Sequence, residues 1–150
     1  MQIVSISQQE CSELLARVTV GRLGCAMDNQ PYVVPVSFSY EPDFIYVFST
    51  FGKKIEWMRN NPKVCLQVDE IGSGSNWTSV VVTGTYLELR DPQYSAEREH
   101  ARGRLSNSVQ WWLTPLAQRR EQVGDLEIEP VFFRIDIVSM SGLRAIPGAQ

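Results

Sequence analysis

The sequence predicts a mainly β protein, a small antiparallel β-barrel with a few helices. Short apolar runs alternate with turns rich in Gly, Pro, Asn and Asp, which is typical of successive antiparallel strands. One run alternates strictly with period two, and helical spacing is confined to short stretches. The chain has 150 residues without a repeat or linker, so we expect one domain over 1–150.

The N-terminal part predicts a helix followed by a strand. Ser7 and Glu10 have the spacing of a capping box, which marks a helix start. Cys11, Leu14 and Leu15 would form the buried stripe of that helix. The run 18–27 then predicts a strand, which the turn at 28–30 ends.

The segment from Pro31 to Tyr40 has the clearest strand pattern. Its even positions are large and apolar or aromatic, and its odd positions are smaller and more polar. Alternate side chains of a strand point to opposite faces, so we expect the even set in the core and the odd set on a shallower face that accepts a ligand. Pro35 has no N–H to donate, which places this strand at an edge or a bulge. The even set is Tyr32, Val34, Val36, Phe38 and Tyr40, and the odd set is Val33, Pro35, Ser37 and Ser39.

The remaining elements follow from similar patterns. After a tight turn at 41–43, we expect strands at 44–49, 63–68, 77–89 and 130–138. Helical spacing marks 52–60, which Asn61-Pro62 ends, and 95 to about 122 with a break near Pro115. We expect a flexible loop at 70–76 and a turn at 139–142.

Composition excludes several classes of function. The net charge of −3 argues against general nucleic-acid binding. A single histidine, His100, excludes a His-rich metal site and is expected to be a solvated helix residue. Three widely spaced cysteines, with Cys25 and Cys65 in apolar runs, indicate reduced core thiols. Neither a signal peptide nor a membrane-spanning run is evident, so we expect a cytoplasmic protein.

The segment from Phe48 to Ile55 carries the strongest chemical signal. A strand ends in Ser49 and Thr50, Gly52 allows an unusual turn, and Lys53 and Lys54 open a helix. Two cations at a helix N-terminus oppose the helix dipole, and a bound anion would remove that conflict. Hydroxyls, helix amides and cations together suit a phosphate group, although a solvated basic helix start is the alternative explanation. Two of only three lysines in the chain lie here.

Three motifs together resemble the pyridoxamine 5′-phosphate oxidase-like superfamily of FMN-binding split β-barrels, in the small branch that includes nitroimidazole-resistance-type proteins. They are Pro31-Tyr-Val-Val-Pro-Val-Ser-Phe38, Gly52-Lys-Lys-Ile-Glu with Asn61-Pro62, and Trp77-Thr-Ser-Val-Val-Val-Thr-Gly84. The resemblance covers nearly the whole chain. It implies a homodimer with two FMN sites at the subunit interface and a small-molecule substrate, without nucleic acid or membrane as partners.

The resemblance also implies which residues bind the cofactor. The backbone of Val33 to Ser37 would run along the flavin ring, and Ser49, Thr50, Lys53 and Lys54 would surround the phosphate and ribityl chain. Trp111 and Trp112 would cover the pocket from the partner subunit or pack ordinarily within a helix. The implied binding residues are Val33, Val34, Pro35, Val36, Ser37, Phe48, Ser49, Thr50, Lys53, Lys54, Trp77 and Ser79.

Departures from the family pattern limit what is carried over. Phe48 stands where some relatives have a histidine, so a mechanism through that histidine is not expected. The C-terminal Arg- and Trp-bearing substrate motif of true pyridoxamine phosphate oxidases is not evident after Pro130, so pyridoxal phosphate synthesis is not expected either. An FMN-dependent oxidoreductase is therefore predicted. A flavin carrier or redox sensor and an F420-binding reductase remain alternatives, while the single histidine disfavours haem.

Overall fold

The computed structural model describes residues 1–106 and 130–147, and those ranges contain seven strands and three helices. Most of the predicted elements are present within one or two residues of their expected limits. In chain order they are β1 (Gln2–Ser5), α1 (Gln8–Arg17), β2 (Val20–Met27), β3 (Gln30–Glu41), β4 (Phe44–Thr50), α2 (Lys53–Asn60), β5 (Lys63–Ile71), β6 (Trp77–Glu88), α3 (Ser95–Ser106) and β7 (Pro130–Ile146).

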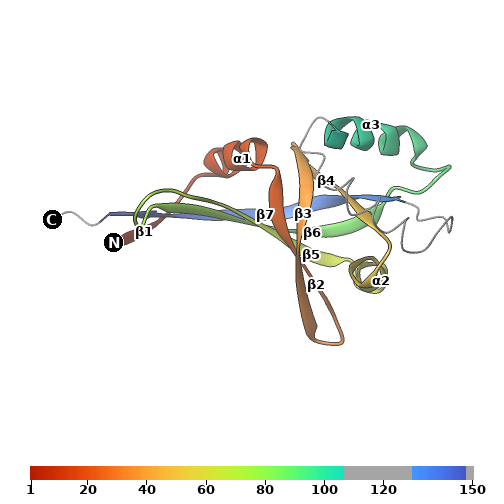
Figure 1. Ribbon diagram of the computed structural model, residues 1–150, viewed down its shortest axis with the longest axis horizontal. Helices are drawn as coiled ribbons and strands as arrows, with labels where there is room; N and C mark the ends of the chain where they lie inside the picture. Colours follow the sequence, from red (N-terminus) through yellow and green to blue (C-terminus); the bar gives the residue numbers. More distant parts are fainter. Residues whose placement is uncertain (107–129, 148–150) are drawn as a thin grey trace, which may run out of the picture.

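The strands form an antiparallel barrel with two partial seams. Their order is β1-β7-β4-β3-β2-β5-β6, and β6 pairs again with β7, which closes the ring and leaves β1 attached outside it. The pairing of β2 with β5 covers Arg22 to Gly24, and the pairing of β3 with β4 covers Phe38 to Glu41. These short pairings split the barrel wall, so the predicted mainly β split-barrel fold is confirmed (Figure 1).

Helix α1 closes one side of the barrel core. The Ser7 hydroxyl accepts a hydrogen bond from the Glu10 amide at 3.1 Å, and the Glu10 carboxylate accepts one from the Ser7 amide, which confirms the capping box. The predicted stripe of Cys11, Leu14 and Leu15 is at most 1% exposed and joins the main core. In Figure 1, α1 and α3 lie above β6 and β7, and α2 lies below these two strands.

Strand β3 follows the predicted alternation, with one exception. The even residues pack in or against the main core, as expected. Of the odd residues, Val33 is 63% exposed and Pro35 is exposed, but Ser37 is only 2% exposed. Ser37 is buried because its hydroxyl turns to the Thr19 carbonyl oxygen, 3.4 Å away. The shallow outer face therefore ends at Pro35, and the side chain of Ser37 does not contribute to it.

Three local expectations are wrong. The turn expected at 139–142 is strand, because Ser139 to Gly142 pair with Val80 to Thr83 of β6, and Val138 bulges out of the register instead. The loop expected from Glu70 begins only after Ile71. Gly52 adopts an extended conformation with φ 177°, which other residues also adopt, so no unusual turn requires glycine there.

Helix α3 is anchored to the sheet by a buried second cluster and an ion-pair network. Phe48 and Phe132 lie 5.3 Å apart between ring centroids and pack beneath Ala101 and Leu105 of α3. Glu97 accepts two hydrogen bonds from Arg134, at 2.7 and 2.8 Å. These contacts fix α3 over β4 and β7. The helix is described only to Ser106, so the expected continuation to about 122, with Trp111 and Trp112, lies outside the described residues.

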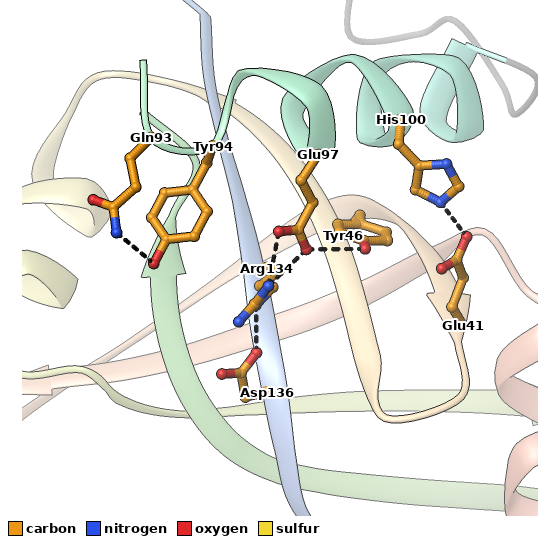
Figure 2. Close-up of polar contacts among 8 residues, drawn as sticks. All are labelled: Glu41, Tyr46, Gln93, Tyr94, Glu97, His100, Arg134 and Asp136. Atoms are coloured by element: carbon orange, nitrogen blue, oxygen red, sulfur yellow. Dashed lines mark hydrogen bonds and ion pairs between the residues drawn. The ribbon is translucent and has the colours of Figure 1, made fainter. Parts of the chain in front are cut away.

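His100 combines the expected exposure with an unexpected partner. Its side chain is 51% exposed, and Nε2 lies 2.6 Å from a carboxylate oxygen of Glu41 at the end of β3. Nearby, the hydroxyl of Tyr46 donates to Glu97, and Figure 2 shows these contacts side by side along α3. Burial, assisted by Glu97, raises the pKa of Tyr46 to about 12, so this hydroxyl stays protonated at neutral pH. His100 thus joins α3 to the sheet.

Candidate functional site

The start of α2 presents free backbone donors and two lysines to an anion. The first amide bonded within the helix is that of Glu56, which donates to the Gly52 carbonyl at 3.1 Å, so the amides before it lack an intrahelical acceptor. No side chain at the cap position bonds to them. Lys53 and Lys54 occupy the same turn. An uncapped helix start with two cations fits a phosphate group, which would accept from the amides and neutralise the charges.

Two aromatic rings hold the Lys53 ammonium over the neighbouring strand. Its Nζ lies 4.9 Å from the ring centroid of Tyr32 on β3 and 4.8 Å from that of Trp57 on α2. The two rings meet edge to face at 5.7 Å. These cation–π contacts orient the charge toward β3, where the flavin ring is expected. Sequence reasoning missed both residues in this role, although Trp57 stands four positions after Lys53 on the helix, a spacing that predicts contact.

Strand β3 offers an open backbone edge beside this helix start. Val33 to Ser37 pair with β2, whereas β4, the strand on the other side, joins β3 only from Phe38 onward. In an antiparallel strand, alternate residues turn their N–H and C=O groups to opposite sides. Part of the backbone between Val33 and Ser37 is therefore directed away from β2, in position for a flat heterocycle with its own donors and acceptors. The expectation that this strand is an edge strand or is bulged at Pro35 is wrong, because β3 lies between β2 and β4 in regular register with β2; the missing N–H of Pro35 is tolerated because β4 does not pair with β3 there.

The hydroxyls at the end of β4 differ in their availability. Ser49 is 5% exposed, and its hydroxyl donates to the Thr50 carbonyl at 3.0 Å. Thr50 is half-buried and ends β4, three residues before Lys53. The side chain of Phe48 packs under α3 and is only 7% exposed. Of these three residues, Thr50 offers a surface hydroxyl, while Ser49 and Phe48 offer mainly backbone.

Trp77 and Ser79 lie far from α2 within one chain. Lys63, just after α2, pairs with Thr85, whereas Ser79 stands six residues earlier on β6. At about 3.3 Å per residue, this separation is about 20 Å. The Ser79 hydroxyl accepts from Gln67, and Trp77 lies opposite Ile71 at the hairpin end. One chain therefore does not bring these two residues together with Lys53 and Lys54.

An apolar hollow of about 520 Å³ opens beside the predicted ring-binding strand. Its lining includes Val33 and Val138, which are 63% and 73% exposed. Cys65 and Cys25 also line it; Cys65 is half-buried, whereas Cys25 is buried. Burial raises the pKa of the Cys25 thiol, with Lys54 nearby acting in the opposite direction. The three cysteines are free, as expected, and Cys25 is a core residue; Cys65 lies nearer the surface than expected.

A second hollow, which is polar, adjoins α2. It has a volume of about 330 Å³ and is bordered by α2, the end of β6, α3 and the start of β7. Glu88 accepts hydrogen bonds from Arg59 at 2.8 and 3.0 Å, from Arg90 at 2.6 Å and from the Tyr86 hydroxyl at 2.6 Å. Burial of Glu88 opposes ionisation, but these donors outweigh it and lower the pKa of Glu88 to about 2. Sequence reasoning missed this cluster because its members come from separate elements.

Replacing the half-buried carboxylate of Glu88 should make the free energy of unfolding less dependent on pH in the acidic range. In the folded state Glu88 stays ionised down to about pH 2, whereas its ordinary pKa is 4.5. The stabilisation is thus present above pH 4.5 and is lost as the pH falls toward 2. We expect Glu88→Gln to lower the free energy of unfolding by about 3 kcal/mol at pH 7.

Urea denaturation between pH 7 and 2 measures this difference, which should shrink steadily on acidification. The matched control is Glu70→Gln, which removes an exposed carboxylate paired with Arg17 and should change stability little. A Glu88→Gln deficit that stays constant over the whole pH range would contradict this assignment.

Two further observations concern metals and membranes. Within residues 1–106 and 130–147, no group of three or more His, Cys, Asp or Glu side chains is placed to hold a metal ion. Across the same ranges, no helix is long and apolar enough to cross a membrane.

The closed barrel with its two seams is a split β-barrel, and the chain is similar to split-barrel proteins that include a flavin-binding relative. The sequence pattern of the pyridoxamine 5′-phosphate oxidase family matches residues 7–144, and the chain belongs to that family.

Individual relatives cover nearly the whole chain. An uncharacterized protein of Rhizobium meliloti is 38% identical over 148 residues, 95% of each chain. A crystal structure of an FAD-binding protein from Mesorhizobium loti is 42% identical with a TM-score of 0.75, covering 98% of this chain and 99% of that one. A candidate 5-nitroimidazole antibiotic resistance protein of Bacteroides thetaiotaomicron shares the fold, with 18% identity, a TM-score of 0.70 and coverage of 95% and 87%.

Proposed function

We propose that this protein binds a flavin nucleotide and uses it to oxidise or reduce a small molecule. The observation that carries the proposal is the uncapped, doubly cationic start of α2 beside the open edge of β3. The relative from Mesorhizobium loti, 42% identical, is an FAD-binding protein, which supports a flavin as the ligand. FMN and FAD share the ring, the ribityl chain and the first phosphate, so the predicted FMN site serves for either.

The residues of this chain would bind and orient the flavin in defined ways. Lys53 and Lys54 neutralise the phosphate, and the first-turn amides of α2 donate to it. Backbone groups of Val33 to Ser37 orient the ring along the β3 edge. When bound, the flavin supplies hydride or electron transfer, so no acid–base side chain is needed from the protein. An oxidoreductase is therefore compatible with the single, partly exposed histidine.

The cofactor that co-purifies with the protein tests this proposal. We expect a yellow protein with flavin absorbance, and a released ligand whose mass equals that of FMN or FAD. A mass matching F420, or haem absorbance, would contradict the proposal. Anaerobic mixing with NADH and NADPH then separates an oxidoreductase, whose flavin is reduced and reoxidised by an acceptor, from a carrier or sensor, whose flavin remains oxidised.

We further propose that the active unit is a homodimer in which the apolar hollow is covered by a second copy. Val33 and Val138 are exposed there, and soluble proteins seldom leave such side chains clustered in a hollow. The separation of about 20 Å between Ser79 and Thr85 supports the same arrangement. Trp77 and Ser79 of the partner subunit would then complete the flavin site that Lys53 and Lys54 begin.

A charge placed in the hollow should separate the two copies. Val138→Asp adds a carboxylate at a side chain that is 73% exposed in one chain, so the monomer should fold normally. Light scattering should show the mass of the protein falling from about twice 17.0 kDa to a single chain, with flavin affinity falling in parallel. Ile3→Asp on β1, where Ile3 is 53% exposed, is the control and should remain dimeric. A Val138→Asp protein that stays dimeric would refute this interface.

A further inference from the structure

The polar hollow beside α2 adjoins the proposed flavin phosphate site. Pro130, which lines the hollow, pairs with Thr50 at the end of β4. Arg59 also lines it and stands six residues after Lys53, about 9 Å along α2. The guanidinium of Arg59 lies 5.1 Å from the ring centroid of Phe51, which connects β4 to α2. A ligand held by the α2 start could therefore continue into this hollow past Phe51.

The charge in the hollow favours an anion. Arg59 and Arg90 share one carboxylate, that of Glu88, while Arg98 pairs with Asp91 at 3.0 Å. Three guanidinium groups thus face two carboxylates, and one positive charge is unmatched among the residues that line the hollow. The contacts with Glu88 use two N–H groups of Arg59 and one of Arg90, from about five on each guanidinium. The remaining donors are the kind that bind phosphate oxygens.

An exposed aromatic ring that could stack on a flat base lies beside the hollow. Leu89 and Phe132 line the hollow itself but are almost fully buried, so they offer little surface to a ligand. Phe51, whose ring contacts the guanidinium of Arg59, is 49% exposed. Exposed aromatic rings beside cations commonly serve as stacking surfaces for nucleic-acid bases. A volume of about 330 Å³ suits a mononucleotide-sized group, near the lower limit of small-molecule pockets.

We propose that this hollow, which is lined by Arg59, Arg90 and Arg98 and has Phe51 in contact with Arg59, binds the adenylate half of a flavin dinucleotide. The inference rests on the proposed function, because it assumes that the first phosphate lies at Lys53 and Lys54. The second phosphate lies against Arg59 and Arg90, and the adenine stacks on Phe51. Glu88 acts as a positioning residue that holds both arginines, and the chain selects the dinucleotide over FMN.

Titration of the flavin-stripped, full-length protein with FAD and with FMN tests this inference. We expect wild-type protein to bind FAD at least about tenfold more tightly than FMN. Arg90 is 61% exposed, so Arg90→Gln leaves the Arg59–Glu88 pair in place. This variant should bind FAD about tenfold more weakly than wild type, while its affinity for FMN should change less than about twofold. Phe51→Leu removes the stacking surface, so it should also weaken the binding of FAD more than the binding of FMN. Arg17→Gln, an exposed paired arginine elsewhere, is the control and should change neither affinity.

Each outcome of the titration is decisive. Equal wild-type affinities for the two flavins, or an Arg90→Gln change that is the same for both, would overturn the adenylate site while leaving the proposed flavin function intact. Failure of wild-type protein to bind either flavin would contradict the proposed function itself, and this inference with it. Thermal melting of the flavin-free variants shows whether each remains folded.

Discussion

The double variant Lys53→Ala/Lys54→Ala should bind flavin at least about 100-fold more weakly than the wild-type protein. Each lysine is expected to make a charge-assisted contact with the phosphate, and such contacts contribute about 1.5–3 kcal/mol each. The flavin-free variant should remain folded. Loss of the cation–π contacts of Lys53 is offset by removal of two charges that oppose the α2 dipole.

Fluorescence titration measures the affinity, and thermal melting of the flavin-free proteins checks the fold. Arg17→Ala/Arg104→Ala is the matched control, since it removes two positive charges that are 53% and 46% exposed on α1 and α3. This control should bind flavin within about twofold of wild type, because exposed charges at a distance are screened. If the Lys53→Ala/Lys54→Ala variant binds flavin as tightly as the wild-type protein, the assignment of the phosphate site to the start of α2 is wrong.

Gly84→Val should destabilise the protein by about 3 kcal/mol or more. A Cβ at this position would stand 2.6 Å from the Ile135 side chain and closer still to the Asp136 carbonyl oxygen. Both groups belong to β7, next to the register shift opposite Val138. Backbone at a bulge cannot move aside as the end of a flexible side chain can, so the strain must open the β6–β7 pairing that closes the barrel.

Urea denaturation measures this effect, and Gly103→Ala is its control. Gly103 lies in α3 and has nothing within 4 Å of a built Cβ. Alanine is the better helix former, so Gly103→Ala should raise the free energy of unfolding by up to about 1 kcal/mol. If Gly84→Val lowers the free energy of unfolding by less than about 1 kcal/mol, the expectation is contradicted, because the β6–β7 pairing then adjusts to the added side chain at little cost.

Local patterns predicted most of the fold. The period-two alternation of β3 and the capping box of α1 are properties of neighbouring residues, and both reappear in the structure. The turn expected at 139–142 failed because turn-forming residue types are also tolerated in a strand that is paired along its length. There the β6 partner decided the conformation. Strand β1 was missed for a similar reason, since four residues acquire strand structure only by pairing with β7.

The residues at the centre of the candidate site could be predicted from the sequence, but the side chains that surround them in space could not. The Lys53-Lys54 pair at a helix start is visible in the sequence, and its position at α2 matches the expectation. That Tyr32 and Trp57 hold Lys53, and that Glu88 joins Arg59 to Arg90, depends on contacts between elements. Such contacts leave no periodic signal. The binding roles of Trp77 and Ser79 depend on a second chain, and they stay predictions.

The most direct test of flavin binding is an equilibrium titration of the flavin-stripped wild-type protein with FMN, FAD and F420 in parallel. We expect a flavin to bind with a stoichiometry of about one per chain, and F420 to bind much more weakly than the preferred flavin. Saturable flavin binding that the Lys53→Ala/Lys54→Ala variant loses would support the site at α2 and β3. Absence of saturable binding by either flavin, or clearly tighter binding of F420, would contradict it.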